Sequence, residues 1–288
     1  MMVLVPGDVV RPRRPDEHFA GEVQAARAAG IDVAVIDHDA LVRGGPGDAA
    51  VARVPAGDDA VYRGWMVRAE RYEALAQALA RRGVTLRTDA ARYRRAHELP
   101  GWYAAAEAHT PASVWTTGDG RDDFLAACAR LGDGAAVLRD YTKSMKHHWH
   151  EAAYLPDVAD HEHAWRVASR FRQLRDDEFT GGFVLRRFER FTGAEARTWW
   201  VGGVCRLVTA HPDTPAQLPP ADLDPGFLAP VLHALDLPFA TADLARRDDG
   251  RWRLVEIGDG QVSDRPRSTG PEQLITALGT GPGEESAV

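Results

Sequence analysis

Lysine and cysteine are both scarce in this chain of 288 residues. Its 35 basic side chains include only two lysines, Lys143 and Lys146, and the others are arginines. Because arginine serves as well as lysine on an ordinary surface, we expect these two positions to need a compact ammonium group on a flexible stem. The two cysteines, Cys128 and Cys205, lie far apart in apolar surroundings, which favours free buried thiols over a disulfide.

Long apolar runs and a positive net charge are absent as well. The first apolar run, Val3–Val5, is broken by Pro6 and is too short for a signal peptide. No stretch approaches the roughly 20 apolar residues that a membrane span needs. The formal net charge of −7 argues against a protein that mainly binds nucleic acid. We therefore expect a cytoplasmic protein that spans no membrane.

The first hundred residues alternate between strand and helix patterns. Strands are expected at 2–5, 31–36, 60–64 and 84–86, and helices at 17–29 and 68–82. This order predicts a small parallel sheet with right-handed crossovers. The turn after the first strand, Pro6-Gly7-Asp8, carries neither the dinucleotide fingerprint nor a P-loop.

From residue 100 onward the pattern becomes richer in strands. Strands are expected at 112–116, 135–139, 183–188, 196–201, 204–210, 239–246 and 251–257, and helices at 122–131 and 161–174. The fold class predicted for the whole chain is α+β with an α/β beginning. The residues after Leu278 have no periodicity, and we expect a disordered tail there.

A polar loop from Asp140 to His150 follows one expected strand and holds both lysines. Cations that leave a strand end into a hydroxyl-bearing loop suit a polyphosphate, and an ordinary solvated loop is the alternative. The histidines of this loop match no standard zinc spacing, so we expect a loop that closes over a nucleotide.

The strand at 184–188 runs into a charged hinge. Backbone groups at Arg187–Glu189 can pair with an adenine edge, and Glu195 can accept from ribose hydroxyls. Arg197 can neutralise phosphate charge that develops during transfer. A surface hairpin with alternating charges is the alternative.

Two further apolar strands each contain a carboxylate, Asp243 and Glu256. Buried carboxylates are costly unless they are paired, so we favour a Mg²⁺ pair over a buried salt bridge. Arg63, at a strand end beside Gly64, suits a substrate contact or a packed structural role. His211 follows a strand where a substrate could lie, and a solvated turn histidine is the alternative.

Together these segments resemble the ATP-grasp superfamily, and more narrowly its clade named for one arginine and two lysines. The most specific pieces are Asp140–Lys146 and Val255–Ser263. The resemblance implies a Rossmann-like pre-ATP-grasp domain at 1–99 and an ATP-grasp domain at 100–279. The latter would comprise a small subdomain at about 112–182 and a large one at about 183–279, two α+β subdomains that clamp ATP. The disordered tail would be 280–288.

The resemblance also implies an ATP-dependent, Mg²⁺-dependent carboxylate–amine ligase that forms an amide or peptide bond through an acyl-phosphate. Its catalytic residues would be Arg197 and Lys146. ATP contacts would be Arg139, Lys143, Lys146, Arg187, Phe188, Glu189 and Glu195, with either lysine on the phosphates. Metal ligands would be Asp243, Glu256 and Asp259, the last replacing an asparagine that the family commonly has where Gly258 stands. The substrate side would include Arg63 and His211.

The implied partners are a small-molecule carboxylate and an amine, amino acids and peptides among them, and a homodimer is the common assembly for such enzymes. Two other functions stay open. One is an ATP-dependent kinase on the same fold, and the other is a non-catalytic nucleotide-binding module. Lys143, Lys146, Asp243 and Glu256 together argue against the module, because a mere binder needs no metal pair.

Overall fold

The computed structural model describes residues 1–45, 47–57 and 59–279. The tail predicted at 280–288 lies outside these residues. The strands are β1 (Met2–Pro6), β2 (Asp32–Ile36), β3 (Asp59–Tyr62), β4 (Thr85–Leu86), β5 (Ser113–Trp115), β6 (Ala136–Asp140), β7 (Tyr154–Leu155), β8 (Phe183–Arg187), β9 (Phe191–Val201), β10 (Val204–Ala210), β11 (Phe239–Arg247) and β12 (Trp252–Asp259). The helices are α1 (Ala20–Ala28), α2 (His38–Val42), α3 (Gly47–Ala50), α4 (Ala69–Ala80), α5 (Ala90–His97), α6 (Leu99–Ala106), α7 (Arg121–Leu131), α8 (His161–Arg175), α9 (Ala229–Leu235) and α10 (Pro271–Gly279).

The chain forms two compact units. Unit 1 combines residues 1–96, 194–244 and those from 256 onward, and unit 2 combines 97–193 with 245–255. Three sheets of four strands have the orders β2-β1-β3-β4, β10-β9-β11-β12 and β5-β8-β6-β7. The mixture of helices and strands confirms the α+β prediction. The division into a leading domain and an ATP-grasp domain stays a prediction.

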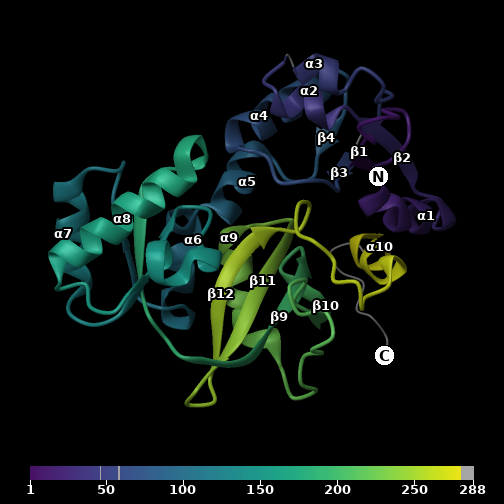
Figure 1. The fold of residues 1–288 in the computed structure, drawn as a ribbon. Coiled ribbons are helices and arrows are strands. Elements are labelled where there is room, and N and C mark those ends of the chain that lie inside the picture. The colour runs from purple at the N-terminus through teal and green to yellow at the C-terminus, as the bar shows by residue number, and fades with distance from the viewer. Residues whose placement is uncertain (46, 58, 280–288) are drawn as a thin grey trace. The chain divides into compact units, whose positions relative to one another are not determined.

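The first sheet is parallel, as its strand–helix alternation predicted. Successive residues of a strand point to opposite faces. Leu4 and Tyr62 therefore pack with α2, α3 and α4, while Val3 and Val61 pack with α1 and α10 on the other face. Helices thus cover both faces, the usual arrangement for a parallel sheet (Figure 1).

The second core of unit 1 joins this sheet to the later strands. Trp199 on β9 and Phe239 on β11 belong to the same buried cluster as Val3 and Val5. The antiparallel register sets Arg197 of β9 opposite Thr209 of β10. This shared core fixes β9 and β11 within unit 1.

Unit 2 is built on an antiparallel sheet covered by α7 and α8 (Figure 1). Phe124 of α7 and Phe171 of α8 pack against Phe183 and Leu185 of β8. In the central pair, Leu138 of β6 lies opposite Leu185. This packing fixes the position at which β6 ends and the lysine loop begins.

Among the described helices, none combines the length and apolar character that crossing a membrane would require.

Candidate functional site

An ion pair between Arg197 and Asp243 joins two neighbouring strands of unit 1, β9 and β11. Arg197 Nε donates to Asp243 Oδ1, and Nη2 donates to Oδ2, each at 2.8 Å. The two side chains are only 12% and 7% exposed. A bidentate pair largely removed from water holds the guanidinium in one orientation.

The charge state of both partners follows from their surroundings. Burial by itself would raise the pKa of Asp243, but the Arg197 guanidinium and the His211 ring outweigh it and hold that pKa well below its usual range. Burial also opposes the charge on Arg197. Three carboxylates reverse that effect and keep the pKa of the guanidinium above its ordinary value, namely Asp243, Glu256 and Asp264. Arg197 is therefore a permanent cation beside acidic groups.

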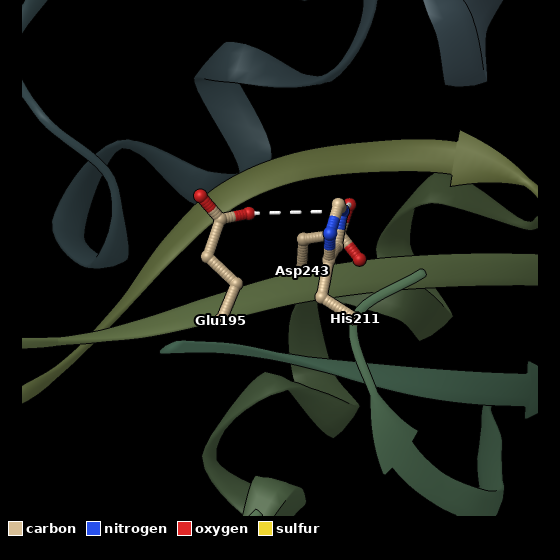
Figure 2. A group of neighbouring side chains, drawn as sticks. All are labelled: Glu195, His211 and Asp243. Carbon is tan, nitrogen blue, oxygen red and sulfur yellow. Dashed lines mark ion pairs between the residues drawn. The ribbon is translucent and has the colours of Figure 1, made fainter. Parts of the chain in front are cut away.

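His211 and Glu195 extend this cluster, and Figure 2 shows the Glu195 carboxylate facing the His211 ring, which lies beside Asp243. His211 Nε2 lies 3.6 Å from Asp243 Oδ2 and 3.9 Å from Glu195 Oε2. One ligand atom from each residue lies within 4.8 Å of the others. The sequence analysis assigned Glu195 to ribose, His211 to the substrate and Asp243 to the metal. The structure brings the three side chains together.

Carboxylates of this cluster suit a hard cation better than the histidine does. Both ring nitrogens of His211 face N–H donors, because the backbone nitrogen of Asp213 lies 3.2 Å from Nδ1 and Arg197 Nη2 lies 3.3 Å from Nε2. Asp243 and Glu256 offer oxygens from neighbouring strands, the donors that Mg²⁺ takes. An oxygen that accepts one arginine N–H keeps a second lone pair.

Asp140 organises the loop of unit 2 that carries both lysines. Its buried carboxylate accepts from the backbone N–H groups of Thr142 and Lys143 at 2.8 and 2.7 Å. The other carboxylate oxygen accepts from Arg175 Nε at 2.8 Å. Lys143 and Lys146 are exposed. Asp140 therefore braces the start of a loop that carries two exposed lysines.

The side chains of Arg139 and Arg187 donate hydrogen bonds to nearby backbone carbonyls. Arg139 Nη2 donates to the Thr142 carbonyl at 2.7 Å. Arg187 Nη2 donates to the carbonyls of Leu131 and Gly132 at 2.6 and 3.1 Å. Arg187 thus satisfies carbonyls at the end of α7. These side chains brace the positions that the resemblance assigned to ATP.

Sequence reasoning missed an aromatic cluster in unit 2. The Phe188 ring lies 5.3 Å from the Tyr154 ring and 6.2 Å from the Trp149 ring, centroid to centroid. Trp149 and Tyr154 stack with a centroid distance of 5.3 Å and an interplanar angle of 15°. All three are partly exposed and can offer ring surface to a flat ligand. The available signal was the tryptophan inside the histidine-rich loop.

Glu189, assigned to the nucleotide, is engaged in ion pairs within unit 2. Its oxygens accept from Arg253 Nε and Nη2, both at 2.9 Å, and Arg247 Nη1 lies 3.6 Å away. The Glu189 side chain is 11% exposed. The Glu189 carboxylate therefore stabilises the hinge by pairing with Arg253.

Arg63 is enclosed within the fold. This corrects its prediction as a substrate contact and favours the packed structural role. It is 1% exposed. Nε and Nη2 donate to Glu22 at 2.8 and 3.0 Å. Nη1 donates to the carbonyls of Gln261 and Ser263 at 3.0 and 3.1 Å, and also to that of Gly260. Arg63 ties the end of β3 to the loop after β12.

Asp259 is not brought to the Asp243 cluster, and the assignment of this residue as a metal ligand is corrected. Residues three apart on a strand point to opposite faces, so Asp259 and Glu256 diverge. Asp259 is fully buried and accepts from Gln261 N at 2.9 Å and Gln261 Nε2 at 3.1 Å. Burial raises the pKa of Asp259 to about 7.

Comparisons with solved structures support the fold. The chain is similar to the crystal structure of a RimK domain protein ATP-grasp from Sphaerobacter thermophilus, with 18% identity, a TM-score of 0.62, and coverage of 96% of this chain and 97% of that one. D-cycloserine synthetase DcsG gives 18% identity, a TM-score of 0.61, and coverage of 96% and 98%. The ATP-grasp ligase PsnB, complexed with minimal precursor, Mg and ADP, gives 13% identity, a TM-score of 0.57, and coverage of 96% and 96%.

No curated protein sequence matches the chain. A family model does match it, over residues 130–278, and describes an ATP-grasp domain of family 3 in the clade named for one arginine and two lysines. This span covers more than half of the chain and includes the lysine loop, the hinge and the Arg197 cluster. The match confirms the resemblance drawn from the sequence: the protein is an ATP-grasp enzyme and belongs to family 3 of that clade.

Proposed function

We propose that this ATP-grasp ligase uses ATP and Mg²⁺ to activate a carboxylate as an acyl-phosphate and joins it to an amine, forming an amide or peptide bond. The observation that carries the proposal is the Arg197 cluster. A permanent, nearly buried guanidinium, oriented by Asp243, suits a reaction whose intermediates carry negative oxygens. In a water-poor site such a fixed charge stabilises developing negative charge far more than in water.

In this proposal Arg197 binds the transferred phosphoryl group and then the acyl-phosphate. Asp243 holds the guanidinium in place during both steps, and His211 Nε2 lies 3.3 Å from Arg197 Nη2. Asp243 and Glu256 would hold Mg²⁺, which supplies charge neutralisation on phosphate oxygens when bound. No side chain needs to become covalently attached, because positioning and charge do the work.

The nucleotide roles are assigned to exposed groups. Lys143 and Lys146 contact the phosphates, and Glu195, whose side chain is 38% exposed, accepts from ribose hydroxyls. The rings of Phe188 and Trp149 stack against adenine, and backbone groups of the hinge pair with its edge. Lysine suits the first role because its ammonium is a compact charge on a flexible stem.

The substrate class is proposed as amino acids or peptides. Among similar folds, PsnB and the macrocyclase MdnC are each described with a precursor peptide, and DcsG is named for a small molecule. These descriptions support substrates of both sizes as candidates for this fold. Cys128 and Cys205 are free, which suits a reducing compartment, and we propose that the enzyme works in the cytoplasm.

An isotope-transfer experiment tests the reaction. Each of the twenty common amino acids, labelled with ¹⁸O in its carboxylate, is incubated with ATP, Mg²⁺ and an unlabelled amino acid mixture. We expect one ¹⁸O atom to appear in inorganic phosphate for each amide formed, because the carboxylate oxygen that attacks the phosphoryl group leaves with it.

The same experiment separates the alternatives. A kinase would release ADP and keep the labelled oxygen in a stable phosphorylated product, without inorganic phosphate. A non-catalytic module would bind ATP and release no ADP. Amide formation without label in phosphate would reject the acyl-phosphate.

A further inference from the structure

The first sheet of unit 1 reverses its strand order between β1 and β3. β1 pairs with β2 on one side and with β3 on the other, so the connections that follow β1 and β2 run in opposite directions along the sheet. Open α/β sheets bind ligands outside the carboxyl ends of strands at such a reversal. Two segments meet at these strand ends, the chain after β3 and the segment that leads into α1. The chain after β3 carries Trp65, and Asp16 N donates to the carbonyl of Pro6 at the end of β1 at 2.9 Å.

His18 stands at this place, in the short turn that precedes α1. Its ring packs on Trp65 with 4.4 Å between centroids. Its Nε2 lies 2.8 Å from Asp264 Oδ1. A carboxylate only accepts hydrogen bonds, so Nε2 carries the proton and Nδ1 of the neutral ring keeps its lone pair. Within the described part of the chain, Nδ1 has no hydrogen-bond donor.

His18 and Asp264 are partly exposed to solvent, and the chain that carries Asp264 is held in place. The side chains of His18 and Asp264 are 42% and 48% exposed, and Trp65 is 36% exposed. The loop that precedes Asp264 is held by Arg63, which donates to three of its carbonyls. A carboxylate anchored in this way can orient an imidazole without moving with it.

Asp264 also touches the reaction cluster. Its backbone carbonyl accepts from Arg197 Nη1 at 3.0 Å. Two hydrogen bonds therefore connect the imidazole of His18 to the guanidinium proposed to hold the acyl-phosphate. All of these residues belong to unit 1. An amine that approaches the acyl-phosphate from the β1 and β3 strand ends would meet the free nitrogen of His18.

We propose that His18 is the general base for the amine substrate and that Asp264 is its positioning residue, with Trp65 as an apolar wall of the amine subsite. The proposal rests on the ligase function proposed above. An ammonium substrate cannot attack, because its nitrogen lone pair is protonated. Nδ1 of His18 takes one proton, the C–N bond forms as the C–O bond to phosphate breaks, and the departing phosphate takes the second proton.

A nucleophile that needs no base tests this assignment. Hydroxylamine is largely unprotonated at neutral pH and converts an acyl-phosphate to a hydroxamate. Hydroxamate formation is measured with ATP, Mg²⁺, the twenty amino acids and hydroxylamine, and ADP release is measured with the amino acids alone as amines. The variants are His18→Ala, His18→Gln and Asp264→Asn, and His161→Ala at the exposed start of α8 is the matched control.

We expect His18→Ala and His18→Gln to lose at least tenfold of the amino-acid reaction while hydroxamate formation stays within threefold of wild type. Free imidazole should restore the amino-acid reaction of His18→Ala, which a purely structural role would not allow. Asp264→Asn should show the same selectivity with a smaller loss. His161→Ala should behave as wild type in both reactions.

The outcomes separate this inference from the function it rests on. Equal loss of both reactions in the His18 variants, or no loss in either, would overturn the general-base role while leaving the ligase intact. Absence of hydroxamate in the wild-type enzyme would instead overturn the acyl-phosphate function, and the role of His18 with it.

Discussion

Arg63 and Arg197 of unit 1 both pair with a buried carboxylate, but their surroundings differ. Arg63 pairs with Glu22, and its remaining N–H groups serve backbone carbonyls, so a structural network surrounds it. Arg197 pairs with Asp243 and also faces an imidazole and a strand-end loop. The difference lies in what surrounds the pair. An arginine enclosed at 1% exposure stabilises the fold, whereas one kept at 12% among ionisable groups can act on a ligand.

The largest expected effect is on the enclosed arginine. Arg63→Ala should lower the free energy of unfolding by about 3–5 kcal/mol, because the buried Glu22 carboxylate would lose its bidentate partner and keep only the longer contact with Arg265 Nε at 3.6 Å. Urea unfolding followed by circular dichroism measures it. Arg81→Ala, which breaks an exposed pair with Asp48, is the control and should cost less than about 1 kcal/mol. Equal losses in the two variants would show that enclosure does not distinguish Arg63.

Arg197 should respond in activity more than in stability. Arg197→Lys keeps one positive charge but loses the fork that pairs with Asp243, and we expect turnover to fall about 10²–10³-fold. Steady-state ADP release and a thermal melt of the same sample measure both quantities. A melting temperature lowered as far as that of Arg63→Ala, or turnover within fivefold of wild type, would remove the contrast between the two arginines.

Two buried aspartates, Asp259 and Asp243, should make the free energy of unfolding depend on pH in opposite directions. The pKa of Asp259 is raised to about 7, so between roughly pH 4, the value for the unfolded chain, and pH 7 the folded state keeps a proton that the unfolded state has lost. The free energy of unfolding should therefore fall as pH rises in this window, by up to about 1.4 kcal/mol per pH unit.

Asp259→Asn should remove that fall, measured as the difference between variant and wild type in urea unfolding at pH 5 and pH 7. Asp243 gives the opposite sign. Its pKa is lowered, so the stability it contributes is present above the unfolded pKa and is lost as pH falls below it. A pH dependence that is the same in wild type and Asp259→Asn would place the protonated group elsewhere.

The smallest expected effect concerns the exposed cations of unit 2. Lys143→Ala and Lys146→Ala should each weaken ATP binding about tenfold, because each removes a charged hydrogen-bond donor to phosphate. Calorimetric titration with a non-hydrolysable ATP analogue measures the affinity, and unfolding of both variants should match wild type. Unchanged affinity in both would remove the loop from the nucleotide site and leave the aromatic cluster as the candidate.

Sequence patterns predicted most strands and the long helices because those elements carry clear periodicity. The helix ranges predicted above do not include α2, α3, α5, α6, α9 or α10. The short α2 and α3 contain little repetition, and α10 is set by packing of Leu274 and Leu278 against α1 and β1. Such long-range packing leaves no local mark in a single sequence.

The candidate site was predicted unevenly for a similar reason. Arg197 and Asp243 could be inferred because a charge inside an apolar strand requires a partner. The identity of that partner was not available, since 46 residues separate the two. Glu189 is assigned to ATP from the hinge pattern, and its ion pair with Arg253 could not be inferred because 64 residues separate the two. Asp259 could have been excluded from the sequence, because its odd spacing from Glu256 already sets it on the other face.

The lysine loop has a practical consequence. Because Lys143 and Lys146 are the only lysines in the chain and both are exposed, a protease that cuts after lysine has its cleavage sites confined to this one loop. Limited digestion would yield a nick whose rate reports the state of the loop. Slower nicking with added nucleotide would measure occupancy directly, with no substrate and no engineered label.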